Sequence, residues 1–264
     1  RGLGDVYKRQ VAQGPIVLEE RLSGPECSLM ALCDGTVARP LPLAQDHKRI
    51  GEGDSGANTG GMGAYAPAPI PYDPDDLTAT FIQPVIDFLM QEGAPYIGVL
   101  YAGLMLTPDG PKLLEYNCRF GDPEAQTVLP LLTDDLAVLA LACCNGELGD
   151  RRIQFQGATC TLVAAAAGYP AAAVTGAAID FGDETTEALL FHAGTDGFQV
   201  TGGRVLAVTG LGDTLAAARG HAYDRMATIA FDGMQVRRDI GWRAIGAGLT
   251  SYAAAGVDID EGTR

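Results

Sequence analysis

Residues 112–120 read KLLEYNCRF and show the alternation that is typical of a β-strand. Successive side chains of a strand point to opposite faces, so we expect one polar and one apolar face here. The polar face would carry Glu115, Asn117 and Arg119. The apolar face would carry Leu114, Tyr116, Cys118 and Phe120. The polar side chains would follow one another in steps of about 6–7 Å.

This polar row suits phosphoryl transfer. Mg²⁺ prefers hard oxygen ligands and usually takes few of them from the protein, and Glu115 and Asn117 can supply such oxygens. The planar guanidinium of Arg119 can neutralise phosphoryl oxygens. An ordinary amphipathic strand with one solvent-facing side shows the same alternation, however. The alternation alone favours that simpler interpretation, so the row needs support from the neighbouring segments.

Several neighbouring segments provide this support. The strand pairs with a second predicted strand, 98–106, through a Pro-Asp-Gly turn at 108–110, which predicts a β-hairpin. The sequence GDPE at 121–124 adds two carboxylates directly after the row. Upstream lie DHKR at 46–49, which is positive in an otherwise acidic chain, and the Gly-rich NTGGMGAY at 58–65. A Gly-rich loop lets backbone N–H groups approach an anion, although alone it fits a flexible connector equally well. Together these segments predict a nucleotide or phosphate site.

The composition limits the class of protein. The chain has 264 residues, 47% hydrophobic and 19% charged, which is typical of one large or two ordinary packed soluble domains. A formal charge of −15 argues against a general nucleic-acid binder. The six cysteines lack metal-ligand spacing and are expected to be reduced core thiols. No signal peptide or membrane span is visible, so we expect a cytoplasmic protein without membrane contact.

Other elements follow from periodicity and turn residues. We expect strands at 16–20 and 26–33, a loop at 51–63 and a helix over 76–91. A further helix would begin near residue 125, bend or restart near Pro130 and continue to residue 144. Beyond a polar break at 145–156 the pattern changes to short strands (159–165, 188–192, 205–209) and a helix with Asp213 as its N-cap. A domain boundary is therefore expected near residue 155. Residues 1–10 have no periodicity and are expected to be foreign to the protein or disordered.

Four segments, in this order and spacing, carry a specific resemblance: QDHKR (45–49), NTGGMGAY (58–65), GVLYAGLML (98–106) and LEYNCRFGDPEAQ (114–126). They resemble the glycinamide ribonucleotide synthetases (phosphoribosylamine–glycine ligases), which are ATP-grasp enzymes. The later segments AAAGYP (165–170), FHAGT (191–195), TGGRVLAVTG (201–210) and RRDIGWRAIG (237–246) are similar to the C-terminal domain of that family. The similarity covers about residues 15–247.

The resemblance implies an α+β fold. Residues 11–155 would form the C-terminal half of an ATP-grasp domain, an antiparallel sheet with helices, and residues 156–247 a small α/β C-terminal domain. The full family enzyme begins with a further α/β domain and a nucleotide lid. The chain is expected to lack that domain and most of the lid, to bind ATP weakly or not at all, and to be inactive as a ligase on its own. Residues 248–264 resemble the start of aminoimidazole ribonucleotide synthetase, which implies a fused second enzyme; an unstructured tail is the alternative.

The resemblance also implies roles for individual residues, with ATP and Mg²⁺ or Mn²⁺ as cofactors. Adenine would contact the backbone at Glu19 and Leu22, and Glu26 would bind the ribose. Glu115 and Asn117 would be the metal ligands; the strand 98–106 adds no carboxylate, which leaves the ligand count open. The catalytic candidates are Arg119, Lys48 and His47, the last as a polar substrate contact. The substrate-binding candidates are Asp122, Glu124, Gly60, Gly61 and Arg204, with Asp122 and Glu124 considered for the ammonium of glycine.

The implied reaction joins 5-phosphoribosylamine to glycine through a glycyl phosphate, with ATP converted to ADP and phosphate. Catalysis of this kind is mostly positioning and charge neutralisation. Two alternatives remain. One is another ATP-grasp ligase acting on a different carboxylate, which the GYP, FHAGT and GGRVL segments argue against. The other is a non-catalytic remnant that acts as a scaffold.

Overall fold

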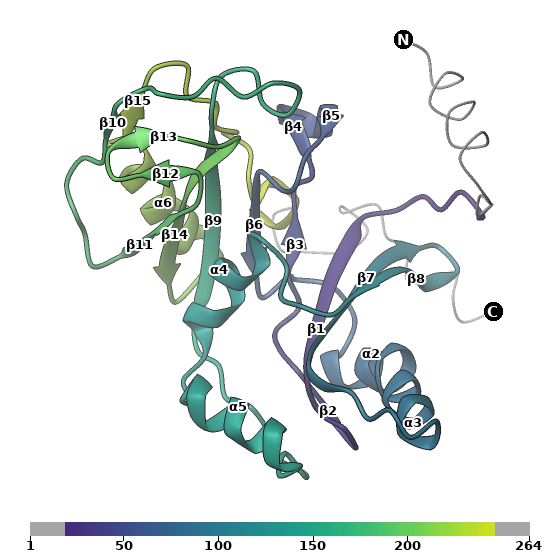
Figure 1. Cartoon of the computed structure of the whole chain (residues 1–264). Helices are drawn as coiled ribbons and strands as arrows, with labels where there is room; N and C mark the ends of the chain where they lie inside the picture. Colours follow the sequence, from purple (N-terminus) through teal and green to yellow (C-terminus); the bar gives the residue numbers. More distant parts are fainter. Residues whose placement is uncertain (1–18, 246–264) are drawn as a thin grey trace.

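Two antiparallel sheets carry the fold of residues 19–245, the part of the chain that this computed structural model describes (Figure 1). The first sheet has four strands in the order β2-β1-β7-β8, and the second has five in the order β11-β14-β9-β6-β3. Helices pack against both sheets, so the predicted α+β class is confirmed. The expectations for residues 1–10 and 248–264 lie outside the described residues. So does most of the strand expected at 16–20, of which Glu19 and Glu20 have no regular structure.

The first sheet is built around β1 (Glu26–Asp34), which pairs with β2 (Ala38–Pro40) and with β7 (Ile97–Thr107). All residues of β1 after Glu26 are buried, because the strand is covered on both faces. One face, including Leu29 and Ala31, packs in a core with α2 (Pro74–Phe81) and α3 (Gln83–Gln91). The other, including Met30 and Leu32, packs in a second core with α5 (Leu136–Asn145).

Two predicted helices are divided in the structure. The helix expected at 76–91 breaks at Ile82 into α2 and α3, because Pro84 lacks an N–H and its ring would clash with the preceding turn of a continuous helix. The helix expected from residue 125 restarts. α4 (Glu124–Val128) runs into a 3-10 turn, η2 (Leu129–Leu131), and α5 begins only after Asp135, whose side chain accepts hydrogen bonds from the N–H groups of Ala137 and Val138.

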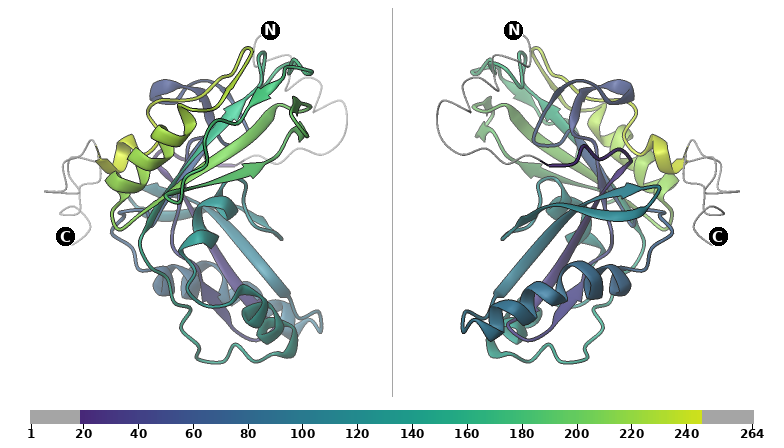
Figure 2. Two further views of the ribbon diagram at one scale, coloured as in Figure 1. Left: turned by 90° about the vertical axis from the view of Figure 1, so that its left-hand side faces the viewer. Right: turned by 90° about the vertical axis from the view of Figure 1, so that its right-hand side faces the viewer.

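The second sheet joins segments from before and after residue 155. β3 (Gln45–Asp46) pairs with β6 (Gly63–Ala66), which pairs with β9 (Ala158–Ala165). β14 (Arg204–Gly212) and β11 (Ala188–His192) complete the sheet, and α6 (Leu215–Met226) packs on β14 and β9 (Figure 2). The expected domain boundary therefore falls between strands of one continuous sheet.

The remaining elements are short. β10 (Ile179–Asp180) pairs with β15 (Ala230–Phe231), β12 (Thr195–Asp196) pairs with β13 (Gln199–Val200), and α7 (Trp242–Ile245) ends the described chain. None of the helices within residues 19–245 is long and apolar enough to cross a bilayer.

Three local expectations were wrong. The segment 51–63 is not one loop, because β4 (Arg49–Gly51) and β5 (Ser55–Asn58) form a hairpin around a 3-10 turn, η1 (Glu52–Asp54), where Gly53 takes a φ of 63°. The N-cap of α6 is Thr214, not Asp213: the Thr214 side chain accepts from the N–H of Ala217. Of the six thiols, Cys118 and Cys144 are exposed rather than in the core.

Candidate functional site

The polar row of the hairpin holds together in the structure. Asn117 Nδ2 donates to Glu115 Oε1 at 3.0 Å, and Arg119 Nη2 donates to Asn117 Oδ1 at 3.4 Å. β8 (Gly110–Asn117) ends at Asn117, however, so the expected strand through Phe120 was too long. Arg119 lies in the bend that follows, where its Nη1 donates to the Phe120 carbonyl at 2.8 Å. The three groups therefore share one side of the hairpin although only two of them lie on the strand.

The apolar side of the hairpin differs from the expected continuous backing. Leu114 is the extra residue of a β-bulge, since Gly103 pairs with Glu115 and Leu104 pairs with Leu113. Tyr116 and Cys118 are exposed, and the Tyr116 hydroxyl donates to the Phe81 carbonyl. Phe120 packs instead against the core that contains Met30 and Leu32. The prediction of one buried face from Leu114 to Phe120 was therefore wrong, because the bulge and the early end of the strand interrupt the alternation.

The strand register shows what the polar row faces. Gly103 pairs with Glu115 on one side and with Ser28 on the other, and Tyr101 pairs with Asn117. Paired residues of an antiparallel sheet project from the same face. Gly103 has no side chain, and its neighbours fill the space beside it: a Cβ on Gly103 would lie 3.5 Å from both Tyr101 Cε1 and Glu115 Cγ. Glu115 and Asn117 therefore lie on the same face of the sheet as Tyr101 and Ser28.

Glu124, the first residue of α4, contacts residues of this face and is almost fully buried, with 4% of its surface exposed. Its Oε1 accepts from the Ser28 hydroxyl at 3.0 Å and from the Tyr101 hydroxyl at 3.2 Å. The Ser28 and Tyr101 hydroxyls are themselves 3.0 Å apart. Two neutral hydroxyl donors thus hold the carboxylate of Glu124, which the sequence placed in the turn after the polar row.

Lys48 and Glu26 form an ion pair at the edge of the same face, each with 35% of its side chain exposed. Asp46 lies beside them, and burial together with the nearby Glu124 carboxylate raises the pKa of Asp46 to about 7. Burial acts to lower the pKa of Lys48, but the carboxylates of Asp46 and Glu26 outweigh it and raise that pKa. Sequence reasoning singled out Lys48 and missed Asp46. The only sequence feature that pointed to Asp46 was its position two residues before Lys48.

His47 is wholly buried, so the structure does not place it where a substrate could touch it. Its Nε2 accepts from the Gly241 N–H at 3.1 Å, and its Nδ1 lies 3.5 Å from Asp54 Oδ1. The ring therefore carries its hydrogen on Nδ1, facing Asp54. Burial, with Arg243 and Arg237 nearby, lowers the pKa of His47. His47 was expected to contact the substrate. Instead it lies inside the protein and links the β4–β5 hairpin to the segment 237–243.

The Gly-rich loop, the turn at 121–124 and Arg204 meet at one point. Arg204 Nη1 donates to the Gly60 carbonyl at 2.9 Å and to the Asp122 carbonyl at 2.7 Å, and it lies 3.0 Å from Asp122 Oδ1. The Gly60 N–H donates to the Tyr169 hydroxyl at 3.1 Å. Gly61 is buried against Pro123. The sequence predicted each of these residues except Tyr169, but not that they bind one another.

The candidates nearest the start of the described chain are less well defined by their contacts. Glu19 is exposed and Leu22 is partly buried, and neither belongs to a strand or helix. Glu26 begins β1, and its carboxylate is engaged by Lys48. The nearby Glu20 forms an exposed ion pair with Lys112 at 3.0 Å.

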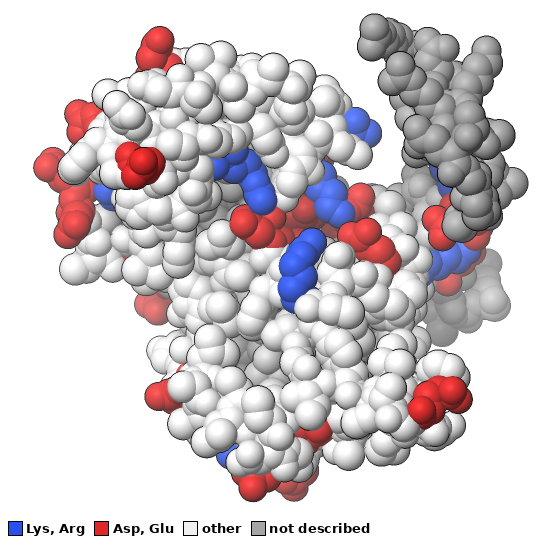
Figure 3. All heavy atoms as spheres, in the orientation of Figure 1, with Lys and Arg blue, Asp and Glu red and all other residues white. Residues whose placement is uncertain are grey.

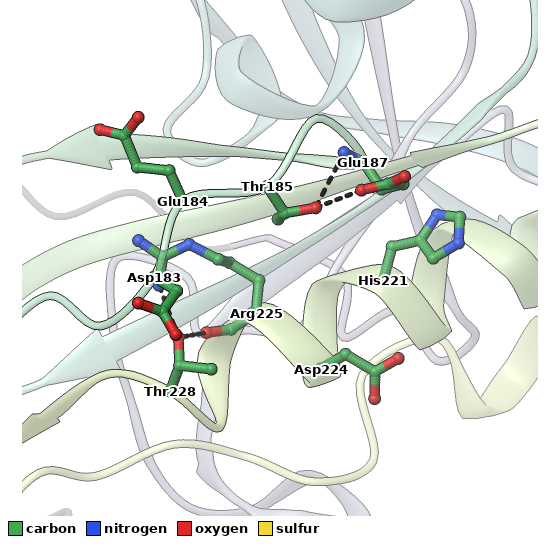
Figure 4. A pocket seen from close by; sticks show the side chains of 8 residues that line it. All are labelled: Asp183, Glu184, Thr185, Glu187, His221, Asp224, Arg225 and Thr228. Atoms are coloured by element: carbon green, nitrogen blue, oxygen red, sulfur yellow. Dashed lines mark hydrogen bonds between the residues drawn. The ribbon is translucent and has the colours of Figure 1, made fainter.

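Charged side chains of both signs gather across the middle of the molecular face shown in Figure 3, where the surface is hollowed between the two sheets. A separate pocket of about 290 Å³ lies between α6 and the segment 183–187 (Figure 4). Its lining is Asp183, Glu184, Thr185, Glu187, His221, Asp224, Arg225 and Thr228. Arg225 is committed to the Phe181 carbonyl and to the Thr228 hydroxyl, at 2.6 and 2.7 Å. The lining holds four carboxylates and one arginine, so its charge does not suit a phosphate.

Comparisons with known proteins agree with this geometry. The family described as phosphoribosylglycinamide synthetase, ATP-grasp (A) domain, matches residues 5–125, and phosphoribosylglycinamide synthetase, C domain, matches residues 159–243. A phosphoribosylamine–glycine ligase of Caulobacter vibrioides is 48% identical over 87% of this chain and 56% of its own length. A bifunctional purine biosynthetic protein of Schizosaccharomyces pombe is 47% identical over 94% of this chain and 33% of its own length. The chain thus spans about half the length of the ligase, and a third of the bifunctional protein.

Solved structures give the same result. The crystal structure of the phosphoribosylamine–glycine ligase of Thermotoga maritima matches with a TM-score of 0.77 and 37% identity, over 84% of this chain and 57% of that chain. A biotin carboxylase of Campylobacter jejuni, at 11% identity and a TM-score of 0.60 over 83% of this chain and 48% of that chain, shares the fold alone. The chain therefore belongs to the phosphoribosylglycinamide synthetase family of ATP-grasp proteins.

Proposed function

We propose that the site serves the ATP-dependent ligation of 5-phosphoribosylamine and glycine to glycinamide ribonucleotide. A glycine carboxylate oxygen forms a bond to the γ-phosphorus while the bond from that phosphorus to the ADP oxygen breaks. The amine nitrogen then attacks the carbonyl carbon of the glycyl phosphate, and phosphate leaves with the C–O electron pair as the nitrogen loses a proton. The observation that carries the proposal is the hydrogen-bonded row Glu115–Asn117–Arg119, which lies on the same face of the sheet as Tyr101 and Ser28.

The row fits a magnesium ion by its donor chemistry, with Mn²⁺ as the alternative. Glu115 and Asn117 offer a carboxylate and an amide oxygen, which are ligands of hard cations. Two protein oxygens suit Mg²⁺, which keeps water and phosphate ligands. When bound, the ion would neutralise charge on the triphosphate.

Arg119 and Lys48 would provide the positive charge of the protein itself. The contacts of Arg119 to Phe120 and Asn117 hold its guanidinium next to the proposed metal ligands, where phosphoryl oxygens would lie. Lys48 is held by Glu26, which begins β1. The proposed ribose contact of Glu26 would require this ion pair to open. Adenine contacts at Glu19 and Leu22 stay part of the proposal.

The site for the glycine ammonium is proposed to include Glu124 rather than Asp122 alone. Asp122 is paired with Arg204, whereas Glu124 receives only neutral donors from Ser28 and Tyr101. A carboxylate without a cationic partner attracts an ammonium more strongly than one already paired. Gly60 and Gly61 would then shape the loop beside the substrate.

The direct test is a ligase assay with ATP, Mg²⁺, glycine and 5-phosphoribosylamine. We would assay the chain itself, and the chain combined with the part of the Caulobacter relative that it does not match. The expected result is ADP release and a product of the mass of glycinamide ribonucleotide, both dependent on glycine and the amine. ADP release that depends on bicarbonate instead, or no product in either preparation, would overturn the proposal.

The longer context of the chain is also a proposal. The match to the bifunctional protein covers 94% of this chain, against 87% for the Caulobacter ligase, and this difference supports a fusion with a further enzyme of purine synthesis. The expected fusion partner is aminoimidazole ribonucleotide synthetase, because residues 248–264 resemble the start of that enzyme. We also propose a cytoplasmic location, as expected from the sequence.

A further inference from the structure

The carbonyl and the N–H of Gly60 are both bound by side chains from beyond residue 155. Its carbonyl accepts from Arg204 Nη1 at 2.9 Å, and its N–H donates to the Tyr169 hydroxyl at 3.1 Å. Arg204 begins β14, and Tyr169 follows β9. The backbone of Gly60 is therefore oriented by two residues more than 100 positions away in sequence, with separations of 144 and 109.

The same arginine also holds the turn that follows the polar row. Nη1 of Arg204 donates to the Asp122 carbonyl at 2.7 Å and forms an ion pair with Asp122 Oδ1 at 3.0 Å. Charge-assisted bonds of this kind are roughly twice as strong as neutral ones. One nitrogen thus joins the Gly-rich loop to the turn that leads into the buried Glu124.

Steric fit shows that this junction is closely packed. A Cβ on Gly60 would lie 3.1 Å from Arg204 Cζ, and a Cβ on Gly61, whose φ is +116°, would lie 2.6 Å from Pro123 Cδ. A Cβ on Gly203 would lie 2.4 Å from the Tyr169 ring. The contacts leave no room for a Cβ at Gly61 or Gly203 and little room at Gly60, so the loop and the turn pack closely against each other.

We propose that Arg204 is a positioning residue of the ligase site, which fixes the Gly-rich loop 59–62 against the turn 121–124 from the C-terminal part of the chain. Its role is to hold the backbone of the loop and the buried end of the turn in register, rather than to bind substrate through Nη1, which is fully engaged. The expected loss of catalysis rests on the proposed function. The expected loosening of the Gly-rich loop can be measured without ligase activity.

The first test is amide hydrogen exchange of the ligand-free chain. In Arg204→Ala, the amides of Gly60 and Gly61 are expected to exchange about tenfold faster or more, because the bonds that hold the loop are lost. Amides of the β1–β7 pair should keep their rates. Arg151→Ala, which removes an exposed arginine distant from the junction, is the matched control. Unchanged exchange at Gly60 and Gly61 would overturn the proposal.

The second test separates positioning from direct substrate binding. In the ligase assay, Arg204→Ala is expected to lower kcat about tenfold or more with the KM of each substrate changed less than about twofold, since misplacement mainly costs orientation. Arg204→Lys should recover part of both the exchange protection and kcat. A large rise in KM with unchanged exchange would show that Arg204 binds substrate instead. If neither preparation of the ligase assay yields product, the proposed function fails, and the exchange result alone decides the role of Arg204.

Discussion

At the scale of single residues, the polar row depends on local hydrogen bonds rather than on strand alternation alone. Arg119 lies beyond the end of β8 and still reaches Asn117, because the bend at Cys118–Arg119 turns its side chain back toward the row. Each of these hydrogen bonds is weak by itself, but together they orient the Glu115, Asn117 and Arg119 side chains relative to one another. The row is exposed, so its residues contribute to chemistry more than to stability.

Glu115→Gln is accordingly expected to lower kcat of the ligase reaction by about a hundredfold or more, because a neutral amide is a poorer metal ligand than a carboxylate. The free energy of unfolding should change by less than about 0.5 kcal/mol, as for other exposed positions. Steady-state kinetics and urea unfolding check the two parts. Glu92→Gln, an exposed acid at the end of α3, serves as the control. Retained activity in Glu115→Gln would exclude Glu115 as a metal ligand.

The buried His47 makes the stability of the folded protein depend on pH. Its pKa is lowered in the folded protein, so the unfolded chain, with an ordinary pKa near 6.5, binds the proton more readily. Stability from this residue is present above about pH 6.5 and is lost as the pH falls below it. The hydrogen bond from His47, together with Arg243 and Arg237, lowers the pKa of Asp54, whose contribution is lost at still lower pH.

We therefore expect urea unfolding to show lower stability at about pH 5.5 than at about pH 7.5, with a smaller difference in His47→Gln. An equal pH dependence in the variant and the unaltered protein would show that other groups cause the loss.

At the scale of elements, capping and backbone chemistry decide where helices begin. The two residues just before α6, Asp213 and Thr214, are both good N-caps, and a sequence pattern cannot choose between them. The structure assigns the cap to Thr214, whose backbone is extended and whose hydroxyl accepts from the Ala217 N–H at 3.2 Å.

Thr214→Ala should therefore destabilise the protein by about 1 kcal/mol, and Asp213→Ala by much less. Thermal or urea unfolding of the two variants makes a matched comparison, because both substitutions remove one exposed polar side chain. The opposite order would assign the cap to Asp213.

At the scale of the whole molecule, ion pairs join the C-terminal segment to the β4–β5 hairpin. Arg237, with 1% of its surface exposed, donates to Asp239 through Nε and Nη2 at 2.8 and 2.7 Å. Its Nη1 lies 3.0 Å from both the Arg49 carbonyl and Asp54 Oδ1. Arg243 also pairs with Asp54.

Arg237→Met is expected to cost about 3 kcal/mol, because it leaves the partly buried Asp239 without its arginine partner and Asp54 with Arg243 as its remaining one. Arg238→Met, which changes the exposed neighbour, should cost less than about 0.5 kcal/mol. Denaturant unfolding measures both. Similar losses in the two variants would mean that the ion pairs of Arg237 do not join these segments.

The sequence alone determined the antiparallel hairpin, the polar row and the family, because turn residues, alternation and motif spacing act over short ranges of chain. It also identified Gly60, Asp122 and Arg204 as residues of interest. Only the tertiary structure decided that these three bind one another, that His47 and Glu124 are buried, and that one sheet crosses residue 155. Such facts depend on contacts between segments far apart in the chain, and burial there depends on which surfaces meet rather than on the local pattern.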